Sequence, residues 1–234
     1  MKLDHPLIRY HGGKFRLASW IISYFPSHET YVEPFGGGAS VLLSKSPSRM
    51  EVYNDLDQDI VNFFEVLRDQ TLAEKLAFQV ELTPYSRSEF LNARAETNDR
   101  IEQARRLVVR AQMGFGSAGA TKGNTGFRLD TARGGSDIVT IWQRQPEVIR
   151  QAAARLKKVL IENRDAIKVI QDHDREDTLF FIDPPYVLDT RNMGGKAYRH
   201  EMSNADHEQL INVLNSCIGK IILCGYDHTI YEAL

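Results

Sequence analysis

The residues best suited to chemistry are a carboxylate and a phenol separated by two prolines, in the sequence Asp183-Pro184-Pro185-Tyr186. They follow the apolar run 179–182, which is too short for a helix and predicts a buried strand. Neither proline can donate a hydrogen bond to a sheet, so the strand ends there, at the edge where open α/β sheets bind ligands. A carboxylate acceptor beside an aromatic face suits a reaction on the amino group of a planar base. The alternative is a common Pro-Pro turn that Asp183 only caps.

A glycine-rich turn at residues 35–40 (FGGGAS) lies between a predicted strand and a predicted helix, where a nucleotide-type ligand needs close backbone approach. Asp55 follows Gly37 by 18 residues, near the ~20-residue spacing at which an acidic residue meets ribose hydroxyls. The sequence contains no Gly-Lys-Ser or Gly-Lys-Thr, which excludes a P-loop. The pattern indicates a nucleoside-containing cofactor without a triphosphate. The alternative is a tight turn with a helix cap at Asp55.

A second glycine turn, residues 9–14 (RYHGGK), carries a cation. It could recognise a carboxylate or simply begin the helix after it, and the residues alone do not decide between the two. Apolar residues at helical spacing predict that helix: Leu17, Trp20, Ile21 and Tyr24.

Composition and charge limit the class of protein. The 234 residues fit one large domain or two small ones, with 42% apolar and 26% charged residues. No stretch approaches the ~20 apolar residues of a membrane span, the N-terminus lacks a secretory signal, and two cysteines cannot form a disulfide framework or a zinc site. We therefore expect a cytoplasmic protein.

The net charge of −2 hides an uneven distribution. Residues 85–160 hold 14 Lys or Arg against 7 Asp or Glu, a balance of +7, whereas the remaining chain is acidic. A basic segment inside an acidic protein is typical of a nucleic-acid-binding element. The alternative is a solvated helical face rich in arginine.

The elements alternate on both sides of this basic segment. Strands are predicted at 31–33, 50–53, 159–161, 179–182 and 221–224. One helix is predicted to begin near Ala39, a second to carry Ile60, Val61, Phe64 and Leu67 on its buried face, and a third to span 205–216. Between them we expect helices only, at 90–95, 101–111 and 146–157, with seven glycines between Gly114 and Gly135. The layout predicts an α/β domain (1–68 and 157–234) interrupted by a basic, mostly helical insertion (69–156).

Four separated motifs occur in the order seen in the Dam-like family of S-adenosylmethionine-dependent DNA adenine-N6 methyltransferases: residues 10–14 (YHGGK), 33–40 (EPFGGGAS), 54–55 (ND) and 183–186 (DPPY). The resemblance spans essentially the whole chain. It implies a Rossmann-like methyltransferase sheet with helices on both faces and a target-recognition insertion. It also implies double-stranded DNA as partner, no metal, no membrane, a monomer or weak dimer, and a bacterial or phage-infected bacterial cell.

The resemblance also assigns residues by position. It places Tyr10, Lys14, Asp55 and Asp183 in contact with S-adenosylmethionine, beside Phe35, with Gly37 and Ala39 allowing close approach and Asp165 bordering the cofactor's adenine. Some relatives have glycine at the position of Ala39. The basic insertion supplies candidate DNA contacts: Arg105, Arg106, Lys122, Arg128 and Arg133.

The implied mechanism uses Asp183 and the carbonyl of Pro184 to accept the two hydrogens of the adenine amino group, with Tyr186 stacking on a flipped-out base. Pro185 completes the motif. Alternatives are a nucleic-acid-binding module with a degenerate cofactor site, and methylation of RNA or of protein glutamine, for which related Asn-Pro-Pro-Tyr sequences are used. The family's sheets usually carry two strands beyond 221–224, so we expect either a truncated chain or a reduced sheet with an exposed edge.

Overall fold

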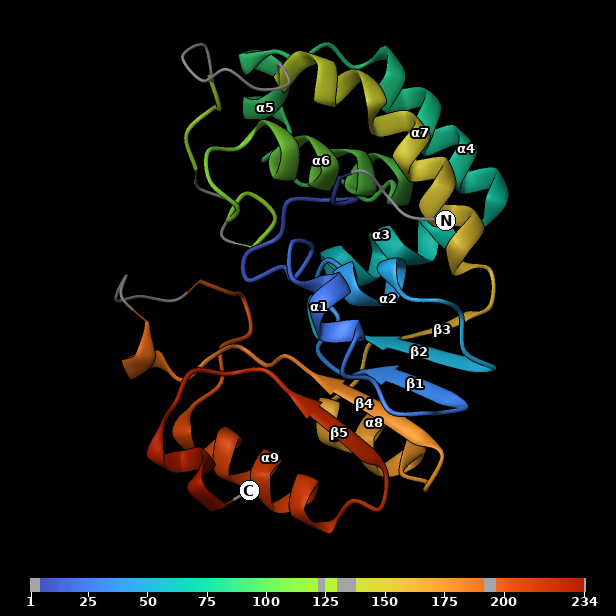
Figure 1. The fold of residues 1–234 in the computed structure, drawn as a ribbon. Coiled ribbons are helices and arrows are strands. Elements are labelled where there is room, and N and C mark those ends of the chain that lie inside the picture. Colours follow the sequence, from blue (N-terminus) through green and yellow to red (C-terminus); the bar gives the residue numbers. More distant parts are fainter. Residues whose placement is uncertain (1–4, 122–124, 130–137, 192–196, 234) are drawn as a thin grey trace.

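The fold is known from a computed structural model, which describes residues 5–121, 125–129, 138–191 and 197–233. Five parallel strands form one sheet in the order β3-β2-β1-β4-β5 (Figure 1). The strands are β1 (Thr30–Glu33), β2 (Met50–Asn54), β3 (Val159–Glu162), β4 (Thr178–Ile182) and β5 (Lys220–Leu223). The chain order along the sheet reverses between β1 and β4, and open α/β sheets bind ligands at such a point.

Helices cover both faces of the sheet because the central strands are apolar on both sides. All residues of β1 and β4 are buried, as expected for parallel strands. Tyr31 points into one core cluster and Val32 into the other. The first cluster includes residues of α1 (Ala18–Ile22), α2 (Ser40–Ser44) and α3 (Gln58–Arg68), and the second includes residues of α8 (Ala166–His173) and α9 (Asn204–Ser216). This architecture confirms the predicted Rossmann-like α/β fold.

The described residues between α3 and β3 are mostly helical and pack on α3. Within it α4 runs beside α7, and α6 contacts both α3 and α4 (Figure 1). The side chains of Asp69, Ser86 and Asp99 cap the starts of α4, α5 and α6 by accepting backbone N–H bonds. The helices are α4 (Gln70–Leu82), α5 (Arg87–Asn92), α6 (Arg100–Met113) and α7 (Ile138–Leu156), and short 3₁₀ turns η1 (Leu188–Thr190) and η2 (Thr229–Ala233) occur later in the chain.

Some predicted boundaries were wrong. Helix α7 begins at Ile138 rather than Pro146, because Trp142 is buried and its Nε1 donates to the carbonyl of Thr83 at 2.8 Å, so the turns before the proline are held by packing. Helix α5 lies three residues earlier than expected because Ser86 caps it. Helix α8 was not predicted. Helix α1 is shorter than the span of the four spaced apolar residues, two of which lie outside it. Only Ile21 of the four is buried, and the other three, Leu17, Trp20 and Tyr24, are at least half exposed.

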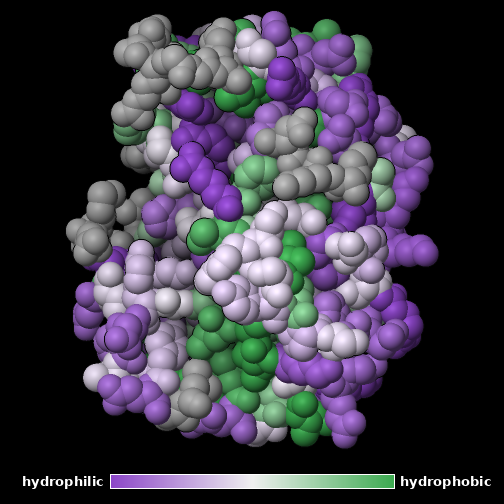
Figure 2. Space-filling model, in the orientation of Figure 1, coloured by the Kyte–Doolittle hydropathy of each residue, from purple (hydrophilic) through white to green (hydrophobic). Residues whose placement is uncertain are grey.

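Strand β5 forms one edge of the described sheet. Its residues after Lys220 are only partly buried, and the neighbouring Ile218 is exposed. Figure 2 shows apolar side chains gathered over this edge. In the described part of the chain, no helix is long and apolar enough to cross a membrane.

Candidate active site

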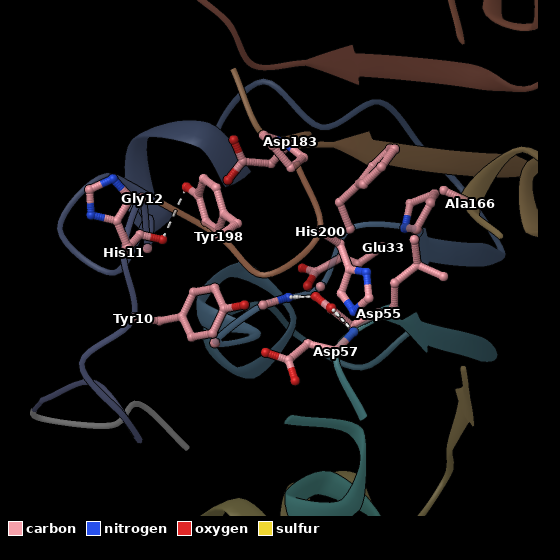
Figure 3. A pocket seen from close by; sticks show the side chains of 18 of the residues that line it. Tyr10, His11, Gly12, Glu33, Asp55, Asp57, Ala166, Asp183, Tyr198 and His200 are labelled. Atoms are coloured by element: carbon pink, nitrogen blue, oxygen red, sulfur yellow. Dashed lines mark hydrogen bonds between the residues drawn. The ribbon is translucent and has the colours of Figure 1, made fainter. Parts of the chain in front are cut away.

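A cavity lies at the carboxyl ends of β1 and β4, where the sheet order reverses. It encloses about 900 Å³, including its open mouth. Its walls include residues 10–14, the glycine turn after β1, the segment after β2, and the residues after β4 (Figure 3). The structure therefore brings together seven predicted site residues: Tyr10, Lys14, Phe35, Gly37, Asp55, Asp183 and Pro185.

The glycine turn is tightly packed on its protein side. A Cβ at Gly36 would lie 2.2 Å from the ring of Tyr53, so only glycine fits there. Gly37 has a φ of +46°, and a Cβ on it would lie 2.7 Å from the ring of Tyr10. Ala39 also has a positive φ, +50°, and is fully buried at the start of α2, so it shapes the turn from behind the cavity wall.

Asp55 fastens this turn to the end of β2. Its Oδ2 accepts a bond from the Gly37 N–H at 2.8 Å, and its Oδ1 accepts one from the Asp57 N–H at 2.8 Å (Figure 3). Burial raises the pKa of Asp55 to about 6, and the two backbone hydrogen bonds partly oppose that rise. The carboxylate thus reaches the cavity with its orientation fixed.

Glu33, at the end of β1, is a second buried carboxyl on the cavity wall, and sequence reasoning did not single it out. Its Oε1 accepts bonds from the Tyr31 hydroxyl and the Leu42 N–H, both at 2.7 Å. Burial raises the pKa of Glu33 to about 7 despite these bonds. A strand-end glutamate followed by Pro-Phe-Gly was the available signal for it.

Asp183 follows β4 and pairs with Lys14 from the N-terminal turn. Lys14 Nζ lies 2.7 Å from Oδ1 and 2.6 Å from Oδ2 of Asp183, and it also donates to the carbonyl of Gly12 at 2.8 Å. Burial raises the pKa of Asp183, whereas the Lys14 ammonium lowers it. Lys14, the cation of the second glycine turn, therefore binds a carboxylate of the same chain, that of Asp183.

The rest of the Asp-Pro-Pro-Tyr motif surrounds this pair. Pro184 is buried and Pro185 lines the cavity. Lys14 Nζ lies 5.1 Å from the centre of the Tyr186 ring, and this ring also meets that of Tyr226 in an edge-to-face contact with centroids 5.2 Å apart. Burial and the adjacent Asp183 raise the pKa of Tyr186, so the phenol is neutral at physiological pH.

The loop 197–202, here called the Arg199 loop, completes the cavity and was missed by the sequence analysis. Tyr198, Arg199, His200, Glu201 and Met202 all line it. The Tyr198 hydroxyl donates to the carbonyl of His11 at 3.3 Å, and Glu201 accepts from the N–H groups of Ala197 and Tyr198. No periodicity or glycine pattern marks this loop.

The remaining predicted residues are not among those that line the cavity, or they lie outside the described part of the chain. Asp165 caps α8 by accepting from the Lys168 N–H, and its neighbour Ala166 lines the cavity. Arg105 and Arg106 bind Glu102 within the insertion. The backbone of Arg128 bonds to Met113 and Tyr85. Lys122 and Arg133 lie outside the described residues.

The described residues contain no group of three or more His, Cys, Asp or Glu placed to hold a metal ion.

The family model for D12 class N6 adenine-specific DNA methyltransferases matches residues 10–231. Among curated proteins, a DNA adenine methylase of Haemophilus influenzae is 35% identical over 69 residues, 29% of this chain and 24% of that protein. A DNA adenine methylase of Escherichia coli is 31% identical over 71 residues, or 30% and 25%. A DNA N-6-adenine-methyltransferase of Escherichia phage P1 is 28% identical over 67 residues, or 29% and 9%. The matches thus span a quarter or less of these relatives' lengths.

Proposed function

Because the chain belongs to the D12 class of N6 adenine-specific DNA methyltransferases, we propose that it transfers a methyl group from S-adenosylmethionine to the N6 amino nitrogen of adenine in double-stranded DNA. The observation that carries this proposal is the position of Asp183. It lies at the end of β4, in the same cavity as the glycine turn and Asp55. One cavity therefore offers an acceptor for an amino group beside a site suited to a nucleoside.

The cavity residues fit S-adenosylmethionine by their chemistry. Asp55 offers a fixed carboxylate to hydroxyl groups, the aromatic ring of Phe35 offers a face to a planar base, and the glycine turn lacks Cβ atoms that would obstruct the backbone. The carboxylate of Asp183, and that of Glu33 above its pKa of about 7, favour a nearby cation. When bound, S-adenosylmethionine supplies an electrophilic methyl group on a positively charged sulfur.

Asp183 would act on the amino nitrogen of the base. That nitrogen is a poor nucleophile because its lone pair is delocalised into the ring. The carboxylate of Asp183 accepts one amino hydrogen and the carbonyl of Pro184 accepts the other, which favours a tetrahedral nitrogen with an available lone pair. Tyr186 stacks on the base. This arrangement is electrostatic stabilisation, and the carboxylate need not remove a proton before the methyl group moves.

Duplex DNA would be held by the helical insertion. Its excess of basic residues favours binding to the phosphates of the DNA backbone. The same docking would place other side chains against base edges in the major groove. The base reaches the cavity by leaving the stack, as methyltransferases that act on duplexes require. The five basic residues named above remain candidate contacts, with Arg105 and Arg106 able to reach a phosphate only by exchanging their carboxylate partner.

The test is transfer of a labelled methyl group to unmethylated duplex DNA, followed by nucleoside analysis for N6-methyladenine. Asp183→Asn replaces an acceptor by a group that accepts only in part, and we expect transfer to fall by about 100-fold or more. Asp189→Asn, an exposed aspartate in η1, is the matched control and should keep normal transfer. Near-normal transfer by Asp183→Asn, or label on RNA or protein in place of adenine, would contradict the proposal.

A further inference from the structure

The Arg199 loop is fastened to the start of α3 by its arginine. Arg199 Nη1 lies 2.6 Å and 2.7 Å from the two carboxylate oxygens of Asp57, and Nη2 lies 2.9 Å from Oδ2 of Asp59. The side chain of Asp57 is only 9% exposed. The side chains of Asp59 and Arg199 are more accessible, at 26% and 34%. A guanidinium that bridges two carboxylates, one of them buried, is more strongly held than a fully exposed ion pair.

Asp59 is shared between this loop and the helical insertion. Its Oδ2 also accepts a bond from Arg110 Nη2 at 3.0 Å, and its Oδ1 accepts one from Gln103 Nε2 at 2.7 Å. Both of these partners lie on α6. Arg110 is buried, so its carboxylate partner cannot be replaced by water without cost. The position of α6 and that of the Arg199 loop therefore depend on one carboxylate.

Asp57 connects the same network to the cavity. Its N–H donates to Asp55, which in turn holds the Gly37 N–H of the glycine turn. Figure 3 shows Asp55 and Asp57 side by side, across the cavity from Asp183. A displacement of Asp57 would therefore move the carboxylate that fixes the glycine turn.

The charges of these residues also contribute to the free energy of this network. Asp55, Asp57 and Asp59 lie within five residues of one another, and two of them face Arg199. With Arg199 withdrawn, Asp57 loses its counter-charge and repels Asp55, while Asp59 is held by the insertion alone. The docked loop thus stabilises both the cavity wall and the start of α3.

We propose that Arg199 is a positioning residue that couples the cavity to the helical insertion through Asp57 and Asp59. With the Arg199 loop docked, the glycine turn and α6 are held together in the arrangement that accepts both ligands. The inference rests on the proposed function, in which the cavity takes the methyl donor and the insertion contacts the duplex. Coupling of this kind is reciprocal, so DNA strengthens cofactor binding by the same factor as the cofactor strengthens DNA binding.

The experiment measures that factor. The dissociation constant of labelled S-adenosylhomocysteine, which supports no turnover, is determined by equilibrium dialysis with and without saturating unmethylated plasmid DNA. Arg199→Gln removes the charge, and Arg199→Lys keeps a charge but not the bidentate geometry. Arg100→Gln is the matched control, because Arg100 also joins α6 to α3, through Glu65, but lies away from the cavity. Thermal unfolding of each variant reports folding separately.

We expect a coupling factor on the order of fivefold or more in the unaltered protein. It should fall toward one in Arg199→Gln, keep an intermediate value in Arg199→Lys, and stay unchanged in Arg100→Gln. A merely structural role would lower the unfolding temperature and both affinities without changing the factor.

An unchanged factor in Arg199→Gln, or a factor of one in the unaltered protein, would overturn the inference while leaving the proposed function intact, provided that both ligands bind. Failure of the unaltered protein to bind either ligand would overturn the proposed function and this inference together.

Discussion

Lys14 Nζ lies 2.7 Å and 2.6 Å from the two carboxylate oxygens of Asp183, although the two residues are 169 positions apart in the chain. The carboxylate proposed to receive an amino hydrogen is therefore already held by an ammonium. An ionised carboxylate has about four acceptor sites, so a base can bind Asp183 without displacing Lys14. The pair has a second consequence. Lys14 lowers the pKa of Asp183 against the effect of burial, and so favours the ionised form of the acceptor.

The first prediction concerns the pH dependence of catalysis. Lys14→Met removes the cation, so the pKa of Asp183 should rise further and the acid limb of the kcat profile should move to higher pH. Activity of the variant should recover in part as the pH is raised. Arg16→Met, a substitution of a nearby exposed cation, is the control. An acid limb at the same pH in Lys14→Met and the unaltered protein would contradict the role given to Lys14.

The second prediction concerns cofactor affinity. Because the pKa of Asp55 is about 6, S-adenosylhomocysteine should bind more weakly as the pH falls through that value, where the carboxylate becomes protonated. Asp55→Asn should weaken binding by about 1–3 kcal/mol at pH 8 and flatten this dependence. Calorimetry at pH 5.5 and 8 measures both effects. Equal affinities of Asp55→Asn and the unaltered protein at pH 8 would rule out Asp55 as a ligand.

Asp165→Asn provides a companion measurement. Asparagine caps helices as well as aspartate does, so the start of α8 should be preserved. A loss of affinity in this variant would therefore mean that a contact between Asp165 and the cofactor has been lost. An unchanged affinity would mean that Asp165 acts only as a helix cap.

The third prediction concerns stability. The pKa of Glu33 is raised to about 7, so the folded protein binds a proton there that the unfolded chain releases above pH ~4.5. The stability from this group is fully present below that pH and is lost as the pH rises through about 7, by about 3 kcal/mol in all. Urea unfolding at pH 5 and pH 8 should show the decrease in the unaltered protein and a smaller one in Glu33→Gln. Glu29→Gln, an exposed control, should behave as the unaltered protein does.

The sheet and half of the cavity could be predicted because their signals are local. Strands β3, β4 and β5 contain runs of three or four apolar residues. Asp183 directly follows β4, and the glycine turn follows β1. Parallel strands end at one edge, so these residues had to meet. Glu33 could have been found by the same reasoning, as the last residue of β1.

The Arg199 loop could not be predicted because its role depends on partners distant in the sequence. Arg199 meets Asp57 across 142 residues, and no periodic pattern marks residues 197–202. Local spacing also misled around α1, where Trp20 in the helix and Tyr24 just after it recur as in a buried face yet lie exposed. Helical periodicity predicts the helix, whereas which face is buried is decided by tertiary packing.

The last prediction separates structural cations from DNA-contacting cations in the insertion. Arg105 is 15% exposed and bound to Glu102 and Glu89, so Arg105→Gln should lower the free energy of unfolding by about 1–3 kcal/mol and leave the salt dependence of duplex binding unchanged. The double substitution Lys122→Gln and Arg133→Gln should instead reduce the slope of log K against log salt, by about 0.9 for each phosphate that the variant no longer binds, with little effect on unfolding. Filter binding across a salt series and urea unfolding measure the two quantities. A flattened slope in Arg105→Gln with unchanged stability would show that Arg105 gives up its carboxylates to bind DNA, and an unchanged slope in the double variant would mean that duplex binding depends on other cations.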